Sequence, residues 1–175
     1  MDPKVKKPES VDKKSVLVNF HLEGDSFPHA WHFNRFRVDS LGDSKMVTLA
    51  LATEATMLSV NAFVMPDTDL RNNRERTINF LGSTGKSAGE VSKYKLGFST
   101  PPARVYPVNH ISLSRIDMTA EMGLYRHSVN SLVAQMTEAK KSGGAKTPLV
   151  TAYPVVMFRA DLNVLLGLIQ ELYTS

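Results

Sequence analysis

The sequence lacks cysteine entirely, which excludes disulfide bonds, thiolate metal ligands and cysteine nucleophiles. It also lacks any apolar run near the roughly 18 residues that a membrane-spanning helix needs. Residues 1–14 do not contain the apolar segment of a secretory signal peptide. From these absences we expect a cytoplasmic protein without a membrane partner.

Positively charged residues outnumber negatively charged ones only slightly. The formal net charge is +4 at pH 7, and half of it belongs to residues 1–14, where five lysines oppose Asp2, Glu9 and Asp12. We predict that this segment is a disordered basic tail. Residues 15–175 are predicted to form a single domain, large enough to bury about two-thirds of its unfolded surface. The remaining charge of about +2 is small for a nucleic-acid-binding protein.

The first third of the chain alternates apolar and polar residues with period two, the pattern of half-buried strands. We predict a strand over Ser15–Leu22 and a second extended segment over Ala30–Val38. Lys45–Ala52 and Thr56–Met65 are predicted to form a hairpin. No Gly or Pro interrupts these last two segments, so a helix through Ala50–Ala55 is a second interpretation.

The middle of the chain reads as a surface loop followed by short strands. Asp67–Arg76 is polar and is predicted to be loop. Thr77–Leu81, Val91–Phe98 and Asn109–Ile116 are predicted strands. Between the first two, Gly82–Gly89 predicts a flexible loop because Gly, Ser and Lys dominate it.

At Asp117 the apolar period changes from two to about 3.6, which predicts a helix that ends near Gly143–Gly144. Its apolar stripe is expected to face the sheet. Replacing Val129 or Leu132 with Asp would then bury an unpaired charge and cost on the order of 3 to 5 kcal/mol.

The last part of the chain predicts a buried strand and a second helix. Thr147–Phe158 is apolar on both faces, and Pro154 requires an edge position or a bulge within it. Asp161–Tyr173 carries one broad apolar stripe. The predicted fold is α+β, with an antiparallel or mixed sheet of about six to seven strands and two amphipathic helices near the C-terminus packed on one face.

A degenerate phosphate-binding loop is the most specific motif. Gly82, Gly85, Lys86 and Ser87 match the end of G-x-x-x-x-G-K-[ST], but Phe80 stands where the first glycine belongs. Backbone N–H groups and Lys86 would neutralise phosphate there, with Ser87 on magnesium. The simpler interpretation is a glycine-rich connection, because the sequence that follows is a poor helix start.

A second candidate is a strand face of alternating aromatic and basic residues, formed by Trp31, Phe33, Arg35 and Arg37. Such a face can stack bases and hold phosphates. The alternative is that the aromatic rings enter the core while the arginines extend to solvent. A basic stretch that would enlarge this surface contains Arg71, Arg74, Arg76, Lys86, Lys93 and Lys95.

Two sequence patterns resemble metal sites but do not meet the requirements of one. His29 and His32 would point to opposite faces of a strand. Asp67–Asn72 begins like a calcium loop, but Arg71 occupies a ligand position and Asn72 replaces the turn glycine. We therefore predict neither a metal site nor a cofactor.

No catalytic set converges in the sequence, so an enzyme is the less favoured class. The first hypothesis is a non-enzymatic binding or assembly protein that acts through a protein surface as a homo-oligomer. Methionines at helical spacing, such as Met118, Met122 and Met136, fit core packing first, and a self-association seam on either predicted helix is the functional alternative. A nucleic-acid-binding module is the second hypothesis, and a nucleotide-binding enzyme is the third.

Overall fold

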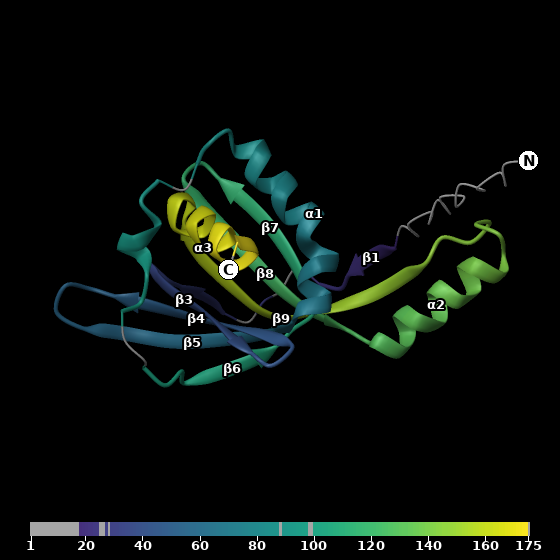
Figure 1. Ribbon diagram of the computed structural model, residues 1–175, viewed down its shortest axis with the longest axis horizontal. Coiled ribbons are helices and arrows are strands. Elements are labelled where there is room, and N and C mark those ends of the chain that lie inside the picture. Colours follow the sequence, from purple (N-terminus) through teal and green to yellow (C-terminus); the bar gives the residue numbers. More distant parts are fainter. Residues whose placement is uncertain (1–17, 25–26, 28, 88, 98–99, 175) are drawn as a thin grey trace, which may run out of the picture.

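The computed structural model of this protein describes residues 18–24, 27, 29–87, 89–97 and 100–174. The basic tail predicted for residues 1–14 lies outside the described residues. The described chain forms an α+β fold with three α-helices and two mixed sheets (Figure 1). Its strands are β1 (Asn19–Leu22), β2 (Ala30–His32), β3 (Arg35–Leu41), β4 (Ser44–Ala52), β5 (Met57–Pro66), β6 (Arg104–Pro107), β7 (His110–Ile116), β8 (Thr119–His127) and β9 (Leu149–Asp161). Its helices are α1 (Asp67–Thr84), a 3₁₀ turn η1 (Val91–Tyr94), α2 (Val129–Lys141) and α3 (Leu162–Thr174).

Strand β9 organises the first sheet, which has the order β1-β9-β8-β7. From Ala152 to Asp161 it pairs antiparallel with β8. On its other edge β1 pairs in parallel with Leu149–Ala152, and β2 pairs in parallel with Met157–Arg159. Pro154 lies between these two stretches, at a register shift against β8. A residue without an N–H is tolerated there because a bulge needs no ladder bond.

The second sheet has the order β3-β4-β5-β6. Strands β3, β4 and β5 form two successive hairpins, and β6 adds in parallel to β5. Leu96 donates its backbone N–H to Phe36 O beside β3, whereas Ala103 donates to Val60 O beside β5. Leu96 and Ala103 therefore lie at different strands of this sheet, β3 and β5.

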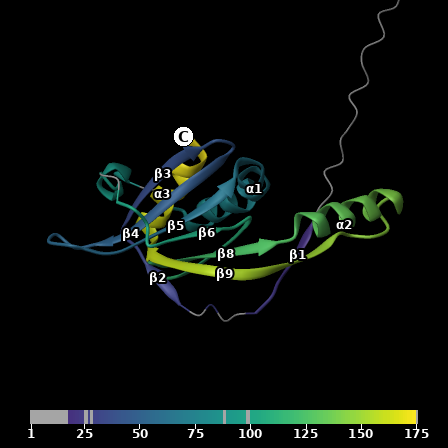
Figure 2. The same cartoon turned by 90° about the horizontal axis from the view of Figure 1, so that it is seen from below.

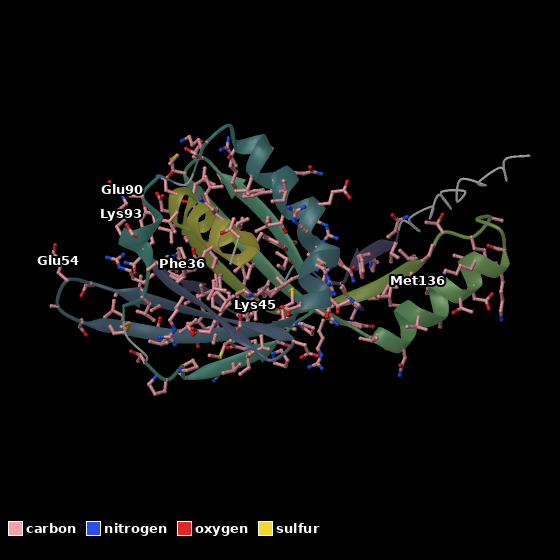
Figure 3. All side chains as sticks on the ribbon, viewed as in Figure 1. Phe36, Lys45, Glu54, Glu90, Lys93 and Met136 are labelled. Carbon is pink, nitrogen blue, oxygen red and sulfur yellow. The ribbon has the colours of Figure 1, made fainter. Side chains whose placement is uncertain are left out.

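The main core joins both sheets to α1 and α3. Phe33 and Phe63 each contact Phe158, with ring centroids 6.2 and 6.1 Å apart. Phe36, which is completely buried, also belongs to this core (Figure 3). Helix α3 buries eight of its 13 residues. We call the two sheets together with α1 and α3 the body of the molecule, and α3 is an internal layer of it.

The predicted extended segment Ala30–Val38 is two strands in different sheets. β2 ends at His32 and joins β9, whereas β3 begins at Arg35 and joins β4. Asn34 makes the change possible, because its side-chain amide donates to Ala52 O (2.7 Å) and accepts from Ala52 N (2.9 Å). At the same point Phe33 N donates to Arg159 O of β9 and Asn34 N donates to Ala50 O of β4, so both N–H groups stay paired as the chain changes sheets.

The predicted loop Asp67–Arg76 and strand Thr77–Leu81 are wrong, because both belong to α1. The buried face of α1 includes Asn73, Thr77 and Thr84 beside Leu70. Polar residues at buried positions remove the apolar period that identifies a helix. The predicted strand Val91–Phe98 is also wrong, since Val91–Tyr94 forms η1 and Lys95 makes only an isolated bridge to Phe36.

The predicted helix start at Asp117 is wrong as well. Asp117 occupies a positive-φ turn (φ 54°) between β7 and β8. The alternation of Ala120, Met122 and Leu124, all buried, belongs to a strand. The helix begins only after Ser128, whose hydroxyl oxygen accepts from Ser131 N.

Other predictions are confirmed. The β4–β5 hairpin turns at Thr53–Thr56, where Thr53 N donates to Thr56 O, so the helical alternative is wrong. The β7 strand, the bulge at Pro154 and the C-terminal helix are present. The α+β class is right, but the described part of the chain has nine strands in two sheets in place of one sheet of about six to seven.

The prediction that both C-terminal helices pack on one face of the sheet does not match the structure either. Helices α1 and α3 pack on the body, whereas α2 stands apart from it (Figures 1 and 2). Among the described helices, none combines the length and the apolar character needed to cross a membrane.

Candidate interaction surface

An arm projects from one end of the body. We define the arm as β1, the end of β8 from Tyr125, α2 and the beginning of β9 as far as Tyr153. Figure 2 shows β9 running from the body into the arm, with α2 at its far end. Figure 3 places Met136 of α2 and Glu54 of the β4–β5 turn at opposite ends of the molecule. The arm therefore presents surface that the body does not cover.

Helix α2 leaves half of its apolar stripe exposed. Val129 and Val133 are each 57% exposed, and Leu132 and Met136 are half-buried. Ala139 is the one residue of α2 that is buried. The helix is held by its Ser128 cap and by contacts with β9. This exposure contradicts the expectation that an Asp at Val129 would be buried against the sheet.

The strand part of the arm exposes apolar side chains too. Leu149 and Tyr153 are 58% and 59% exposed, and both lie on the face of β9 opposite Val150 and Ala152. Leu22 at the end of β1 is also exposed. Clusters of exposed apolar residues on a projecting element are typical of protein interaction sites.

A network of buried polar groups lies where the arm joins the body. The Asn109 side chain donates to His127 O and accepts from His127 N, both at 2.9 Å. Asn73 of α1 accepts from Ile111 N (3.1 Å) and donates to Asn109 O (3.2 Å). The Asn109 amide therefore pairs the last residue of β8, whereas the Asn73 amide pairs backbone groups at the outer edge of β7, which α1 closes.

His110 is the titratable centre of this junction. Its Nε2 lies 2.9 Å from Nη1 of Arg76, and the Phe20 ring of β1 covers it at a centroid distance of 4.4 Å. Phe20 also packs on His127, at 5.1 Å. Burial, then the Arg76 guanidinium and His127, lower the pKa of His110 to about 3. A neutral imidazole can accept the hydrogen bond that Arg76 Nη1 donates.

The phosphate-loop residues occupy the wrong end of a helix for anion binding. Gly82 lies in the last turn of α1, and Gly85 is its C-cap in the left-handed conformation (φ 62°). Lys86 and Ser87 follow as exposed residues. The carboxyl end of a helix presents carbonyl oxygens and negative potential, which disfavour phosphate. The geometry thus gives no support to a nucleotide site.

The aromatic and basic face is divided between two sheets. Phe33 is buried in the core, and Trp31 packs against it from β2. Arg35 and Arg37 lie on β3, and Arg37 pairs with Asp39 at 2.7 Å. No continuous stacking platform joins these four residues.

The basic stretch is dispersed as well. Arg71, Arg74 and Arg76 lie on α1, and Arg76 turns into the β7 junction. Lys95 pairs with Glu171 at 3.0 Å. Lys93 lies 5.1 Å from the Tyr94 ring centroid, and Lys86 contacts Met118 Sδ. Arg76, Lys86, Lys93 and Lys95 thus make their contacts on separate elements.

The other predicted sites have simple explanations. The His29 ring packs beside the Trp31 ring. Asp67 and Asp69 occupy the first turn of α1, where negative side chains interact favourably with the positive end of the helix dipole. Over the described ranges, no three His, Asp or Glu side chains gather in a way that could hold a metal ion.

A groove of about 410 Å³ lies between the β4–β5 turn and the Lys95–Gly97 segment. Arg35 and Lys95 line it, with Leu96 and Met57 contributing apolar surface. Its residues do not converge on a reacting position.

Sequence reasoning missed Leu149 and Tyr153 as surface residues, because an apolar strand reads as buried. A signal for α2 was present: no charged residue occurs from Ser128 to Thr137. An exposed helix normally carries charge on its solvent face.

Comparison of this chain with protein-family models, curated proteins and solved structures gave no match.

Proposed function

We propose that this protein is a non-enzymatic assembly protein that self-associates through its arm. The observation that carries the proposal is the exposure of Val129 and Val133 on a helix without charged residues from Ser128 to Thr137. Burying such side chains against a partner is favourable by about 25 cal/mol per Å² of apolar surface removed from water.

The proposal is favoured over nucleic-acid binding by the distribution of charge. A polyanion needs several cations on one surface, whereas Arg37, Arg76 and Lys95 of the predicted basic surface contact their own neighbours on separate elements. It is favoured over nucleotide chemistry because Gly82 and Gly85 lie at the carboxyl end of α1.

Static light scattering and sedimentation over a wide concentration range test the proposal. We expect the wild-type chain to form a reversible multimer and the Val129→Asp/Val133→Asp double variant to be monomeric. Leu58→Asp is the matched control, because Leu58 is 58% exposed but lies on β5 of the body. This control should associate like the wild type.

A wild-type chain that stays monomeric at every concentration would overturn the proposal. Anisotropy of a labelled single-stranded oligonucleotide at two salt concentrations separates the alternative. Salt-sensitive binding that requires Arg35 and Arg37, without self-association, would favour the nucleic-acid hypothesis.

A further inference from the structure

Helix α2 carries the apolar stripe of an amphipathic helix on the arm. Val129, Leu132, Val133 and Met136 follow one another at steps of three, one and three positions. This spacing is the same in both directions along the helix. A two-fold axis between Leu132 and Val133 would set Val129 opposite Met136 of a second antiparallel helix, and Leu132 opposite Val133.

Charge favours a second copy of the same chain as the occupant. The α2 surface from Ser128 to Thr137 contains no ionised side chain, so two copies meet without like-charge repulsion. Glu138, Lys140 and Lys141 stand in the last turn, away from the centre of the stripe. A nucleic acid or a charged peptide would leave its own charges unpaired on this surface.

Access also favours this pairing. Val129 and Val133 are each more than half exposed. The arm holds α2 at the end of the molecule, away from α1 and α3 (Figures 1 and 2). A second arm can therefore approach α2 without a collision between the two bodies.

We infer that two copies of this chain pair through antiparallel α2 helices, with Leu132 and Val133 at the two-fold axis. This inference rests on the proposed self-association and specifies its partner surface. The seam from Val129 to Met136 is about 10 Å long. Small interfaces of this kind are transient, so the dimer is reversible and concentration-dependent.

Disulfide trapping tests this geometry in a chain that has no native cysteine. Two Cα atoms more than about 7 Å apart cannot be bridged. The Leu132→Cys and Val133→Cys variants should each form covalent dimers on mild oxidation. Val129→Cys alone should not, because its symmetry mate lies two helical turns away.

A mixture of Val129→Cys and Met136→Cys chains supplies the decisive pair. We expect a covalent heterodimer from the mixture and little covalent dimer from either chain alone. Leu58→Cys is the matched control for collisional oxidation, since its side chain is equally exposed on the body. Circular dichroism of the reduced variants confirms that each is folded.

Self-trapping of all four single-cysteine variants would indicate parallel helices and overturn the antiparallel seam. No trapping above the Leu58→Cys control, in a chain that light scattering shows to be multimeric, would also overturn it while leaving self-association in place. A monomeric wild-type chain would instead remove the proposed function itself, so the two failures are distinguishable.

Discussion

Helices α2 and α3 are both 13 residues long and both carry an apolar stripe, yet they differ in how many of their residues are buried. Helix α3 buries eight residues in the core, including Leu165, Leu166 and Leu168. Helix α2 buries only Ala139. An apolar stripe thus specifies a face that needs a partner, but it does not specify whether that partner belongs to the same chain.

The largest expected loss of stability comes from a substitution in α3. Leu166→Ala should lower the free energy of unfolding by about 2–5 kcal/mol, because Leu166 is fully buried and the lost side chain leaves a cavity. Chemical denaturation measures the change. An effect as small as that of an α2 substitution would mean that the two helices do not differ in packing.

A substitution at the junction between arm and body should have an intermediate effect on the free energy of unfolding. Asn73→Ala removes the acceptor of Ile111 N and the donor to Asn109 O. Leaving buried backbone groups unpaired should cost about 1–3 kcal/mol. Asn79→Ala, on an exposed position of α1, is the control. Equal melting temperatures for the two variants would show that the Asn73 amide does not hold the β7 edge.

The same junction should make stability depend on pH. The folded state keeps His110 neutral down to about pH 3, whereas the unfolded chain takes up a proton near pH 6.5. The unfolded state therefore binds more protons in this window, and stability should fall as pH drops from about 6.5, with a slope of at most about 1.4 kcal/mol per pH unit.

His110→Gln should flatten this dependence between about pH 6.5 and 5. The range stops there because burial raises the pKa of Asp69, which contributes with the opposite sign in more acidic solution. Urea denaturation at several pH values is the measurement. An unchanged slope in the variant would assign the pH dependence to other groups.

The smallest effect on unfolding should occur in α2. Val133→Ala is expected to change the free energy of unfolding by no more than about 0.5 kcal/mol, as for other exposed positions. Denaturation at low protein concentration, where a dimer is dissociated, isolates this effect. A loss comparable to that of Leu166→Ala would place α2 in the core and remove the contrast with α3.

Local pattern was sufficient where the buried face is uniformly apolar. The β4–β5 hairpin and α3 were predictable because Val47, Leu49, Leu165 and Leu166 repeat with the period of their element. Helix α1 was not predictable, because Asn73 and Thr77 occupy buried positions through hydrogen bonds to Asn109 O and Asn73 O. Those partners are known only when the chain is folded.

The sequence by itself determined the α+β class, the absence of disulfides, the principal hairpin, the bulge at Pro154 and the final helix. Tertiary structure alone decided that Asn34 separates two sheets and that α2 stands on an arm. The reason is physical: periodicity records which residues share a face, since that depends on backbone geometry. Whether the face meets a surface depends on distant pairings such as Asn19 with Leu149, which no local pattern encodes.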